Sequence, residues 1–151
     1  MKFYSRLGIY KASNVVFDAK SLDSYSYSWW KITRKIGPYI VFNDYNYSKS
    51  TRRHQSKIRS LMCKLGIEVS ADVQAPQGLQ NLDAARQYYI IEISNIEAEI
   101  AKPRSQKLKN EWRRSMITQR KLELAFVTKL MTIEAREFKK SMQGVSDDPA
   151  E

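Results

Sequence analysis

Few residues of this 151-residue chain have side chains that could carry out a reaction. The chain has one histidine, His54, and one cysteine, Cys63. Between Asp23 and Glu68, Asp44 is the only acidic residue. A metal-dependent nuclease requires clustered carboxylates, and a single histidine with a single cysteine indicates neither a metal site nor a nucleophile. HxH, paired-aspartate and glycine-rich phosphate motifs do not occur. The sequence therefore predicts a protein that is not an enzyme and has no cofactor or metal.

Positive charge is the strongest signal in the sequence. The net charge is +10 at pH 7, and two segments concentrate it. Residues 45–67 contain no acidic residue, and residues 102–121 contain one, Glu111. The basic residues are Lys49, Arg52, Arg53, Lys57, Arg59 and Lys64 in the first segment, and Lys102, Arg104, Lys107, Lys109, Arg113, Arg114, Arg120 and Lys121 in the second. Both segments should attract polyanions.

This charge favours nucleic acid, an anionic membrane surface or an acidic protein as partner. A membrane-surface helix concentrates its charge opposite a strongly apolar face, whereas here the charge is spread over several elements. The chain has no apolar run of transmembrane length, and its start lacks the apolar core of a signal peptide. A lone cysteine fits a reducing compartment. We therefore expect a cytoplasmic protein with no membrane partner.

An aromatic hairpin is predicted to present part of the binding surface. Segments 25–35 and 39–47 flank Ile36-Gly37-Pro38, which is typical of an antiparallel hairpin with a loop of about three residues. With Lys35 opposite Tyr39, the core face holds Trp30, Ile32, Ile40 and Phe42, and the other face holds Tyr25, Tyr27, Trp29, Lys31, Thr33, Lys35, Val41, Tyr45 and Tyr47. Rings interleaved with lysines are suited to base stacking. Alternatively, these rings only pair across strands, and the C-terminal helices cover them.

The remaining elements of the first half follow from local patterns. Alternation over residues 2–11 predicts one strand, and residues 15–17 predict a second. A helix is predicted from a cap at Ser50 or Thr51 to a stop at Gly66. His54 falls on the inward stripe of this helix, which favours a structural, hydrogen-bonded histidine over a general base. Residues 68–78 lose periodicity and contain Pro76, which indicates a linker or a loop.

The second half predicts two long helices. Apolar residues at helical spacing run from Leu79 to Ile100, and Lys102-Pro103 ends this helix. A second helix is predicted from 103 to about 142, with its apolar side formed by Trp112, Leu122, Phe126, Leu130, Ile133 and Phe138. At ~1.5 Å per residue the first helix is too short to cover the second, which favours self-association as a homo-oligomer. Packing of the second helix against the N-terminal sheet, or a break in that helix, would also bury the excess. The basic tip between the helices should project from the body.

Together these patterns predict an α+β fold: an N-terminal antiparallel sheet packed on one helix, followed by a long C-terminal helical hairpin. We expect a basic sheet-plus-helix domain over residues 1–67, a linker over 68–78 and a helical hairpin over 79–142 that self-associates as a coiled coil. Residues 143–151 are expected to form a disordered acidic tail.

Several segments resemble small, uncharacterised proteins of tailed bacteriophages. The similar pieces are FYSRLGIY, SNVVF, YSYSWWK, VFNDYNYS, TRRHQSKIRSL and the closing LGI, which lie mainly within residues 2–67. A weaker similarity surrounds KPRSQKLKNEWRR. The resemblance brings no assigned activity and no catalytic residues. It implies the cytoplasm of an infected bacterium and an accessory or host-takeover role.

The leading hypothesis is a phage-type accessory protein that binds DNA or RNA without catalysis. The predicted nucleic-acid-binding residues are Trp29, Lys31, Tyr45, Tyr47, Arg52, Arg53, Lys57, Arg59, Arg104, Lys107, Lys109, Arg113 and Arg114. The alternative is a protein-binding module that acts through the helical hairpin, either as an inhibitor with an acidic host protein as target or as a virion component.

Overall fold

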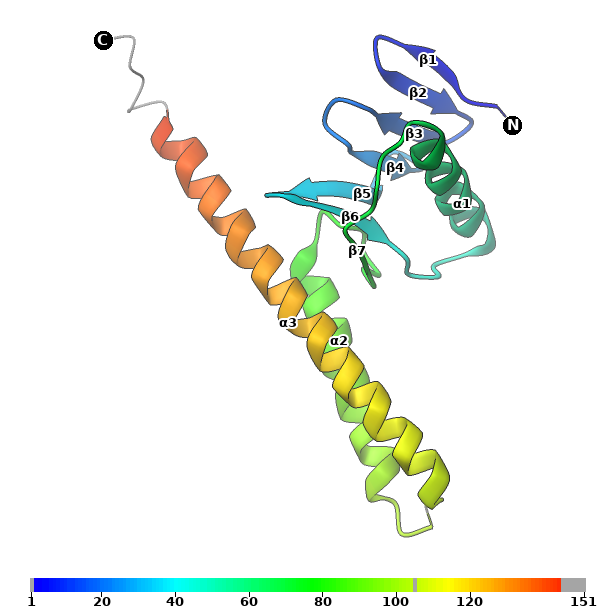
Figure 1. Ribbon diagram of the computed structural model, residues 1–151, viewed down its shortest axis with the longest axis vertical. Helices are drawn as coiled ribbons and strands as arrows, with labels where there is room; N and C mark the ends of the chain where they lie inside the picture. The colour runs from blue at the N-terminus through cyan, green and yellow to red at the C-terminus, as the bar shows by residue number, and fades with distance from the viewer. Residues whose placement is uncertain (1, 105, 145–151) are drawn as a thin grey trace.

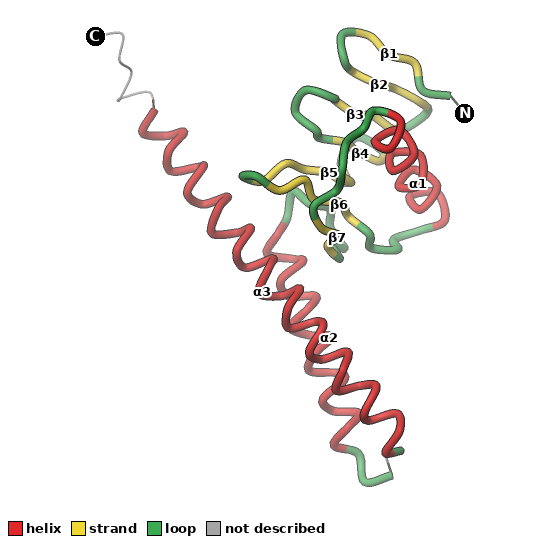
Figure 2. Tube along the Cα trace, viewed as in Figure 1, coloured by secondary structure: helices red, strands yellow, loops and turns green. Residues whose placement is uncertain are grey.

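The computed structural model describes residues 2–104 and 106–144 and has the predicted α+β fold. A sheet and one helix form a body, and two long helices form a hairpin that passes it (Figure 1). Figure 2 shows the same arrangement by type of secondary structure. The strands are β1 (Tyr4–Arg6), β2 (Ile9–Ala12), β3 (Val15–Asp18), β4 (Ser24–Ser26), β5 (Trp30–Ile36), β6 (Tyr39–Asn43) and β7 (Ala71–Val73), and the helices are α1 (Lys49–Lys64), α2 (Leu82–Ala101) and α3 (Lys107–Gly144).

The seven strands lie in the sheet in their sequence order, from β1 to β7. Strands β1 to β6 pair antiparallel, as predicted for the N-terminal sheet, but the predicted strands over 2–11 and 25–35 each divide into two. Strand β7 pairs parallel with β6. Residues 68–78 therefore do more than link two domains, because they contribute the last strand. The prediction missed β7 because a strand of three residues is too short to show a period, and Val73 is buried by neighbours remote in sequence.

The N-terminal segment differs from the single strand predicted over residues 2–11. It forms two strands, β1 and β2, which pair around Leu7 and Gly8. Both turn residues have positive φ, 55° and 84°, as a type I′ hairpin turn requires. A two-residue turn leaves the alternation of apolar and polar residues nearly intact, so the sequence pattern concealed it.

The β5–β6 register differs from the prediction by one residue. Lys35 pairs with Ile40, not with Tyr39, because the turn has two residues rather than three. Gly37 has a φ of +56° and precedes Pro38, which fits a type II′ turn. Ile40 is only half-buried, whereas Val41 and Thr33, both predicted on the exposed face, are buried. The sheet is thus covered on both sides.

The N-cap of helix α1 lies two residues before Ser50 and three before Thr51, the two predicted caps. Ser48 is the N-cap, and its Oγ accepts a hydrogen bond from the Thr51 backbone N–H at 3.2 Å. The helix stops as predicted at Gly66. The N–H of Gly66 donates to the carbonyl of Cys63 at 3.1 Å, and that of Ile67 donates to Met62 at 2.9 Å. These two bonds form a Schellman motif.

Two hydrophobic cores share strand β6. The core beneath α1 contains Val15, Phe17, Trp30, Ile32, Phe42, Ile58, Leu61 and Met62. The core beneath α2 and α3 contains Ile36, Val41, Val73, Ala75, Leu79, Leu82, Ala85, Tyr89, Val127 and Leu130. Val41 and Phe42 are neighbours in β6 but belong to different cores, because successive side chains of a strand point to opposite faces.

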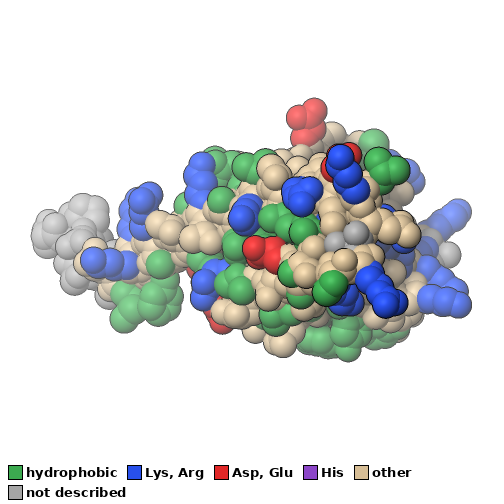
Figure 3. Space-filling model, turned by 90° about the horizontal axis from the view of Figure 1, so that it is seen from below, with side chains coloured by type: hydrophobic (Ala, Val, Ile, Leu, Met, Phe, Trp, Pro, Cys, Tyr) green, Lys and Arg blue, Asp and Glu red, His purple; other side chains and the backbone are tan. Residues whose placement is uncertain are grey.

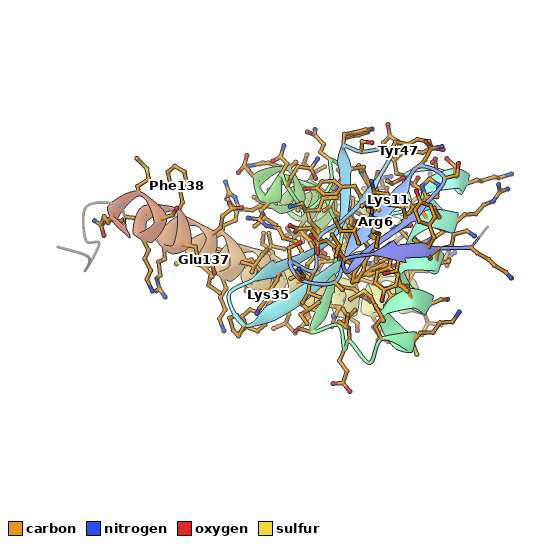
Figure 4. The ribbon with its side chains drawn as sticks, turned by 90° about the horizontal axis from the view of Figure 1, so that it is seen from above. Arg6, Lys11, Lys35, Tyr47, Glu137 and Phe138 are labelled. Atoms are coloured by element: carbon orange, nitrogen blue, oxygen red, sulfur yellow. The ribbon has the colours of Figure 1, made fainter. Side chains whose placement is uncertain are left out.

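The hairpin breaks at Lys102 and Pro103 as predicted, but α2 begins at Leu82 rather than Leu79, and α3 begins at Lys107 rather than at residue 103. The C-terminal part of α3 extends past the first residue of α2 and contacts the β5–β6 hairpin. Arg34 pairs with Glu134 at 2.6 Å, and Glu137 accepts a hydrogen bond from the Gly37 backbone N–H at 3.0 Å. Figure 4 shows Glu137 on the side of α3 near Lys35 and Phe138 on another side.

The predicted apolar side of α3 is only partly buried. Val127 and Leu130 are its buried residues, whereas Trp112, Leu122 and Phe138 are more than 60% exposed. The predicted disordered tail began at residue 143, but Gln143 and Gly144 end α3. The rest of the predicted tail, 145–151, lies outside the described residues.

Asn43 joins the parts of the body. Its Nδ2 donates to the carbonyls of Lys31 at 3.2 Å and Ala75 at 2.9 Å. Its Oδ1 accepts from the N–H groups of Tyr45 at 3.1 Å and Ala75 at 3.2 Å. The amide of Gln55 in α1 donates to the Asn43 carbonyl at 2.7 Å. The side chain is fully buried, and both of its polar atoms are satisfied twice.

We expect Asn43→Ala to lower the free energy of unfolding by about 3 kcal/mol or more, because several buried backbone groups lose their partners together. Urea unfolding followed by circular dichroism measures this loss. Asn46→Ala, at an exposed position three residues later, is the control and should change stability by less than about 0.5 kcal/mol. Equal stability of the two variants would contradict the role given to Asn43.

Candidate nucleic-acid interface

The basic residues of α1 lie on two different flanks of the helix. A helix advances by roughly 100° per residue, so Arg52, Ser56 and Arg59 follow one flank. Arg53, Lys57, Ser60 and Lys64 follow the other flank. Long side chains project from α1 away from the sheet (Figure 4). We call these the arginine flank and the lysine flank.

The arginine flank is neutralised by carboxylates from the sheet. Arg52 Nη1 lies 2.9 Å from Asp44 Oδ1, and Arg59 Nη2 lies 3.2 Å from Asp72 Oδ1. Arg59 also lies 3.9 Å from Asp44, and its guanidinium carbon is 3.8 Å from the ring centre of Phe42. Arg52 and Arg59, both predicted to contact phosphate, are therefore engaged within the chain. A ligand would have to compete with Asp44 and Asp72 for them.

The lysine flank forms one wall of a cleft whose other wall is the start of the chain. The cleft has a volume of about 550 Å³. It is lined by Lys2, Phe3, Tyr10, Ser56, Lys57, Ser60, Leu61 and Lys64, and this set contains no acidic residue. Lys2 and Lys64 are exposed, and the rings of Phe3 and Tyr10 are half-buried. The cleft therefore combines positive charge with accessible ring surface.

Three exposed rings stand near the start of α1. Trp29 and Tyr47 pack edge to face with ring centres 6.1 Å apart, and about half of each side chain is exposed. Tyr47 directly precedes the N-cap residue Ser48. Tyr27 lies in the β4–β5 turn, with its ring centre 5.0 Å from that of His54. Trp29 and Tyr47, both predicted to bind nucleic acid, are thus on the surface.

Lys31 and Tyr45 do not join this exposed group. The Lys31 ammonium lies 3.2 Å from Asp23 and 5.2 Å from the ring centre of Tyr25, and only 12% of its side chain is exposed. Tyr45 is half-buried and packs against Tyr88 of α2. The predicted alternation of rings and lysines along one open face is therefore not formed.

The hairpin tip is basic, as predicted. Arg104, Lys107, Lys109 and Arg114 are exposed. Arg113 is partly covered, and its guanidinium donates to Asn110 at 3.0 Å. Seen from below, with the tip nearest the viewer, Lys and Arg side chains surround the tip and hydrophobic side chains lie between them (Figure 3). The tip lies at the far end of the hairpin from α1 (Figure 1), so one chain does not bring the two basic regions together.

His54 and Cys63 have no catalytic surroundings. His54 is buried, and its Nδ1 shares a hydrogen bond of 2.6 Å with Ser26 Oγ, as expected for a structural histidine. Burial, with a smaller effect from nearby Lys57, lowers the pKa of His54 below its ordinary value. Cys63 is exposed on α1. Residues 2–104 and 106–144 contain no group of three histidine, cysteine or acidic residues placed to hold a metal ion.

Lys2, Phe3 and Tyr10 line the cleft but were not predicted as binding residues. They lie more than 40 positions before Ser56, the first α1 residue of the cleft, and only the β1–β2 hairpin brings them to it. The alternation around Phe3 and Tyr10 was the available signal, but it indicated a strand rather than a cleft.

Comparison with known proteins matches the chain to no family model, no curated protein and no solved structure. Within the described residues, no helix has the length and apolar character needed to cross a membrane. Charge and geometry are therefore the basis for assigning a function.

We expect His54 to make stability depend on pH. Because its pKa is lower in the folded chain than in the unfolded chain, the folded state favours the neutral ring. The stabilisation is present above the unfolded pKa, which is about 6.5, and is lost as the pH falls through the folded value. Urea unfolding at a series of pH values should show a smaller loss of stability below about pH 6.5 in His54→Gln than in the wild type. Parallel pH profiles would show that His54 does not titrate in this way.

Proposed function

We propose that this protein binds nucleic acid without a chemical step, through the cleft between the lysine flank of α1 and the start of the chain. The observation that supports this most directly is the lining of the cleft: three lysines, two aromatic rings and no carboxylate. The resemblance to phage proteins supports an accessory role in an infected bacterial cell.

Phosphate groups are the ligands that the lysine flank suits best. Exposed lysines release counterions when they neutralise phosphates, which gives affinity without base recognition. Lys2 and Lys64 stand on opposite walls of the cleft, so a strand lying in it would meet positive charge on both sides. Lys49 and Arg53 are exposed nearer the start of α1 and extend the same flank toward Tyr47.

The rings favour bases that are not already stacked in a duplex. Phe3 and Tyr10 line the cleft, and Trp29 and Tyr47 lie beside the start of α1. A base stacked on an aromatic side chain contributes about 1–3 kcal/mol with little dependence on sequence. Duplex bases already stack on one another, so rings in a cleft favour single strands and loops.

We expect Lys2→Ala/Lys57→Ala/Lys64→Ala to weaken binding of a fluorescein-labelled oligothymidylate, measured by fluorescence anisotropy. A probe of about 20 nucleotides is longer than the roughly 4–16 nucleotides that one single-strand binding site covers. If the three lysines each meet a phosphate, the slope of log affinity against log salt should become shallower by about 2. A matched duplex probe should bind less tightly than the single strand to the wild type.

Two variants control for loss of charge alone. Arg136→Ala/Lys139→Ala/Lys140→Ala removes three exposed positive charges near the C-terminal end of α3. This variant should leave the slope of log affinity against log salt nearly unchanged. Arg52→Gln/Arg59→Gln removes two charges from α1 itself, but from the arginine flank, and should have the smaller effect per charge. Equal weakening per charge removed in all three variants would mean that only net charge matters, and the cleft would lose its assignment.

A second candidate function is protein binding through the helical hairpin. Phe138 and Met142 lie near the C-terminal end of α3 and are 66% and 67% exposed. Such side chains are suitable interface anchors. A bacterial protein that stays bound at equal stoichiometry after nuclease treatment, and is lost with Phe138→Ser, would favour this function. Retention of nucleic acid by Phe138→Ser would favour the cleft.

A further inference from the structure

The tip of the helical hairpin contains a second basic hollow. It has a volume of about 220 Å³ and lies between the end of α2 and the start of α3, lined by Glu99, Lys102, Arg104, Gln106, Lys109 and Arg113. Four of these six lining residues are basic, and Glu99 is the only acid among them. The Glu99 carboxylate lies 2.6 Å from the Lys102 ammonium and 3.8 Å from Arg113 Nη2. One carboxylate cannot neutralise four cations, so the hollow keeps an excess of positive charge that suits phosphate.

An exposed aromatic ring stands beside this hollow. Trp112 directly precedes Arg113 in α3, and 63% of its side chain is exposed. Because a helix turns by roughly 100° per residue, Lys109 and Arg113 lie on the flank to one side of Trp112. Lys107 and Arg114 lie on the flank to the other side. The indole therefore offers a stacking surface with cations on both sides of it, which is the combination that binds single-stranded nucleic acid.

The tip is remote from the cleft beside α1. Helix α1 covers one core on one face of the sheet, and the hairpin covers the other core on the opposite face (Figure 1). Val127 is the α3 residue nearest the tip that belongs to the core beneath α2 and α3. From Lys109 to Val127 the helix rises by roughly 27 Å, so the tip extends at least that far from this core. A short strand held in the cleft therefore does not reach the tip.

Nucleic acid fits the tip better than an anionic lipid surface does. A helix that lies on a membrane buries a continuous apolar face along its length. Leu108 and Trp112 supply only one turn of exposed apolar surface, and the next residues on the same side, Ser115 and Gln119, are polar and exposed. The positive charge, in contrast, surrounds the ring on both flanks and in the hollow. This arrangement complements a strand with a phosphate at every nucleotide.

We propose that the tip binds a second segment of single-stranded nucleic acid, so that one chain joins two segments. This inference rests on the proposed function, because the first segment occupies the cleft. At the tip a base stacks on Trp112, and the neighbouring phosphates contact the cations on its flanks and in the hollow. Because the two sites lie at opposite ends of the molecule, the bound segments are held apart. The chain thus connects two strands, or two distant parts of one strand, without a chemical step.

Stoichiometry with a short oligothymidylate tests for two sites. A probe of about six nucleotides spans roughly 20 Å at a phosphate spacing of ~3.4 Å, too short to occupy both sites. At low salt we expect two probes per wild-type chain, and one per chain for the cleft variant Lys2→Ala/Lys57→Ala/Lys64→Ala and for the tip variant Lys107→Ala/Lys109→Ala/Arg114→Ala. In the cleft variant, adding Trp112→Ala should weaken the remaining site about fivefold or more, whereas Trp112→Phe keeps a ring and should weaken it less.

Capture of one probe by another tests whether a single chain joins them. Beads with the immobilised short oligothymidylate should retain its fluorescein-labelled form when wild-type protein is added, and should not do so with either variant. An equal mixture of the two variants should not restore capture, because each chain has lost one site.

The outcomes separate this inference from the proposed function. Two probes bound to the cleft variant would contradict the proposed function. Two probes bound to the tip variant, or wild-type capture by it, would overturn only the present inference. Capture restored by the mixture would place the two sites on different chains and would also overturn it. So would Trp112-dependent binding to anionic lipid vesicles by a wild-type chain that binds one probe.

Discussion

The structure depends on strand β6, which contributes side chains to both hydrophobic cores and ends at the buried, fully hydrogen-bonded Asn43. Val41 and Phe42 direct one strand into the core beneath α2 and α3 and the core beneath α1. Asn43 then ends the strand and ties β5, Ala75 and α1 together through its side-chain amide and its carbonyl. A buried amide with every donor and acceptor satisfied tolerates little displacement. The position of α1, and with it the cleft, follows from this junction.

The same junction divides the charges of α1. Asp44 directly follows Asn43, and Asp72 lies beside it in β7, so both carboxylates reach the arginine flank. The lysine flank faces the start of the chain instead, where the lining residues include no acid. Helix periodicity places the two flanks at different angles around α1 but does not show which charges each flank will meet. The sheet supplies carboxylates to the arginine flank, whereas the lining of the cleft beside the lysine flank contains none. The proposed function therefore rests on the cleft, with Lys2 and Lys64, rather than on Arg52 and Arg59.

Local patterns in the sequence predicted where helices end better than they predicted which strand residues pair and which distant side chains come into contact. The Gly66 stop, the break at Pro103 and the inward place of His54 depend on residues within one helical turn, and the structure confirms all three. The β5–β6 register was wrong because a two-residue and a three-residue turn differ by one position, and Gly37-Pro38 fits both patterns. The ion pairs of Arg59 and the approach of Lys2 to α1 depend on chain segments far apart, for which a single sequence contains no signal.

Spacing at steps of three and four also cannot tell which surface will cover an apolar stripe. In α3 the residues facing α2 and the residues facing outward both repeat with this period, so the sequence-based prediction merged them into one apolar side. The structure separates them, because Arg120 inside the seam contacts Glu92 at 2.9 Å and Glu123 at 2.7 Å. These ion pairs join α3 to α2 and favour one rotation of α3 against α2, although one oxygen of Glu92 is buried without a hydrogen-bond partner. That rotation turns Trp112 and Leu122 outward, so the polar contacts in the seam account for the exposure of these two apolar side chains.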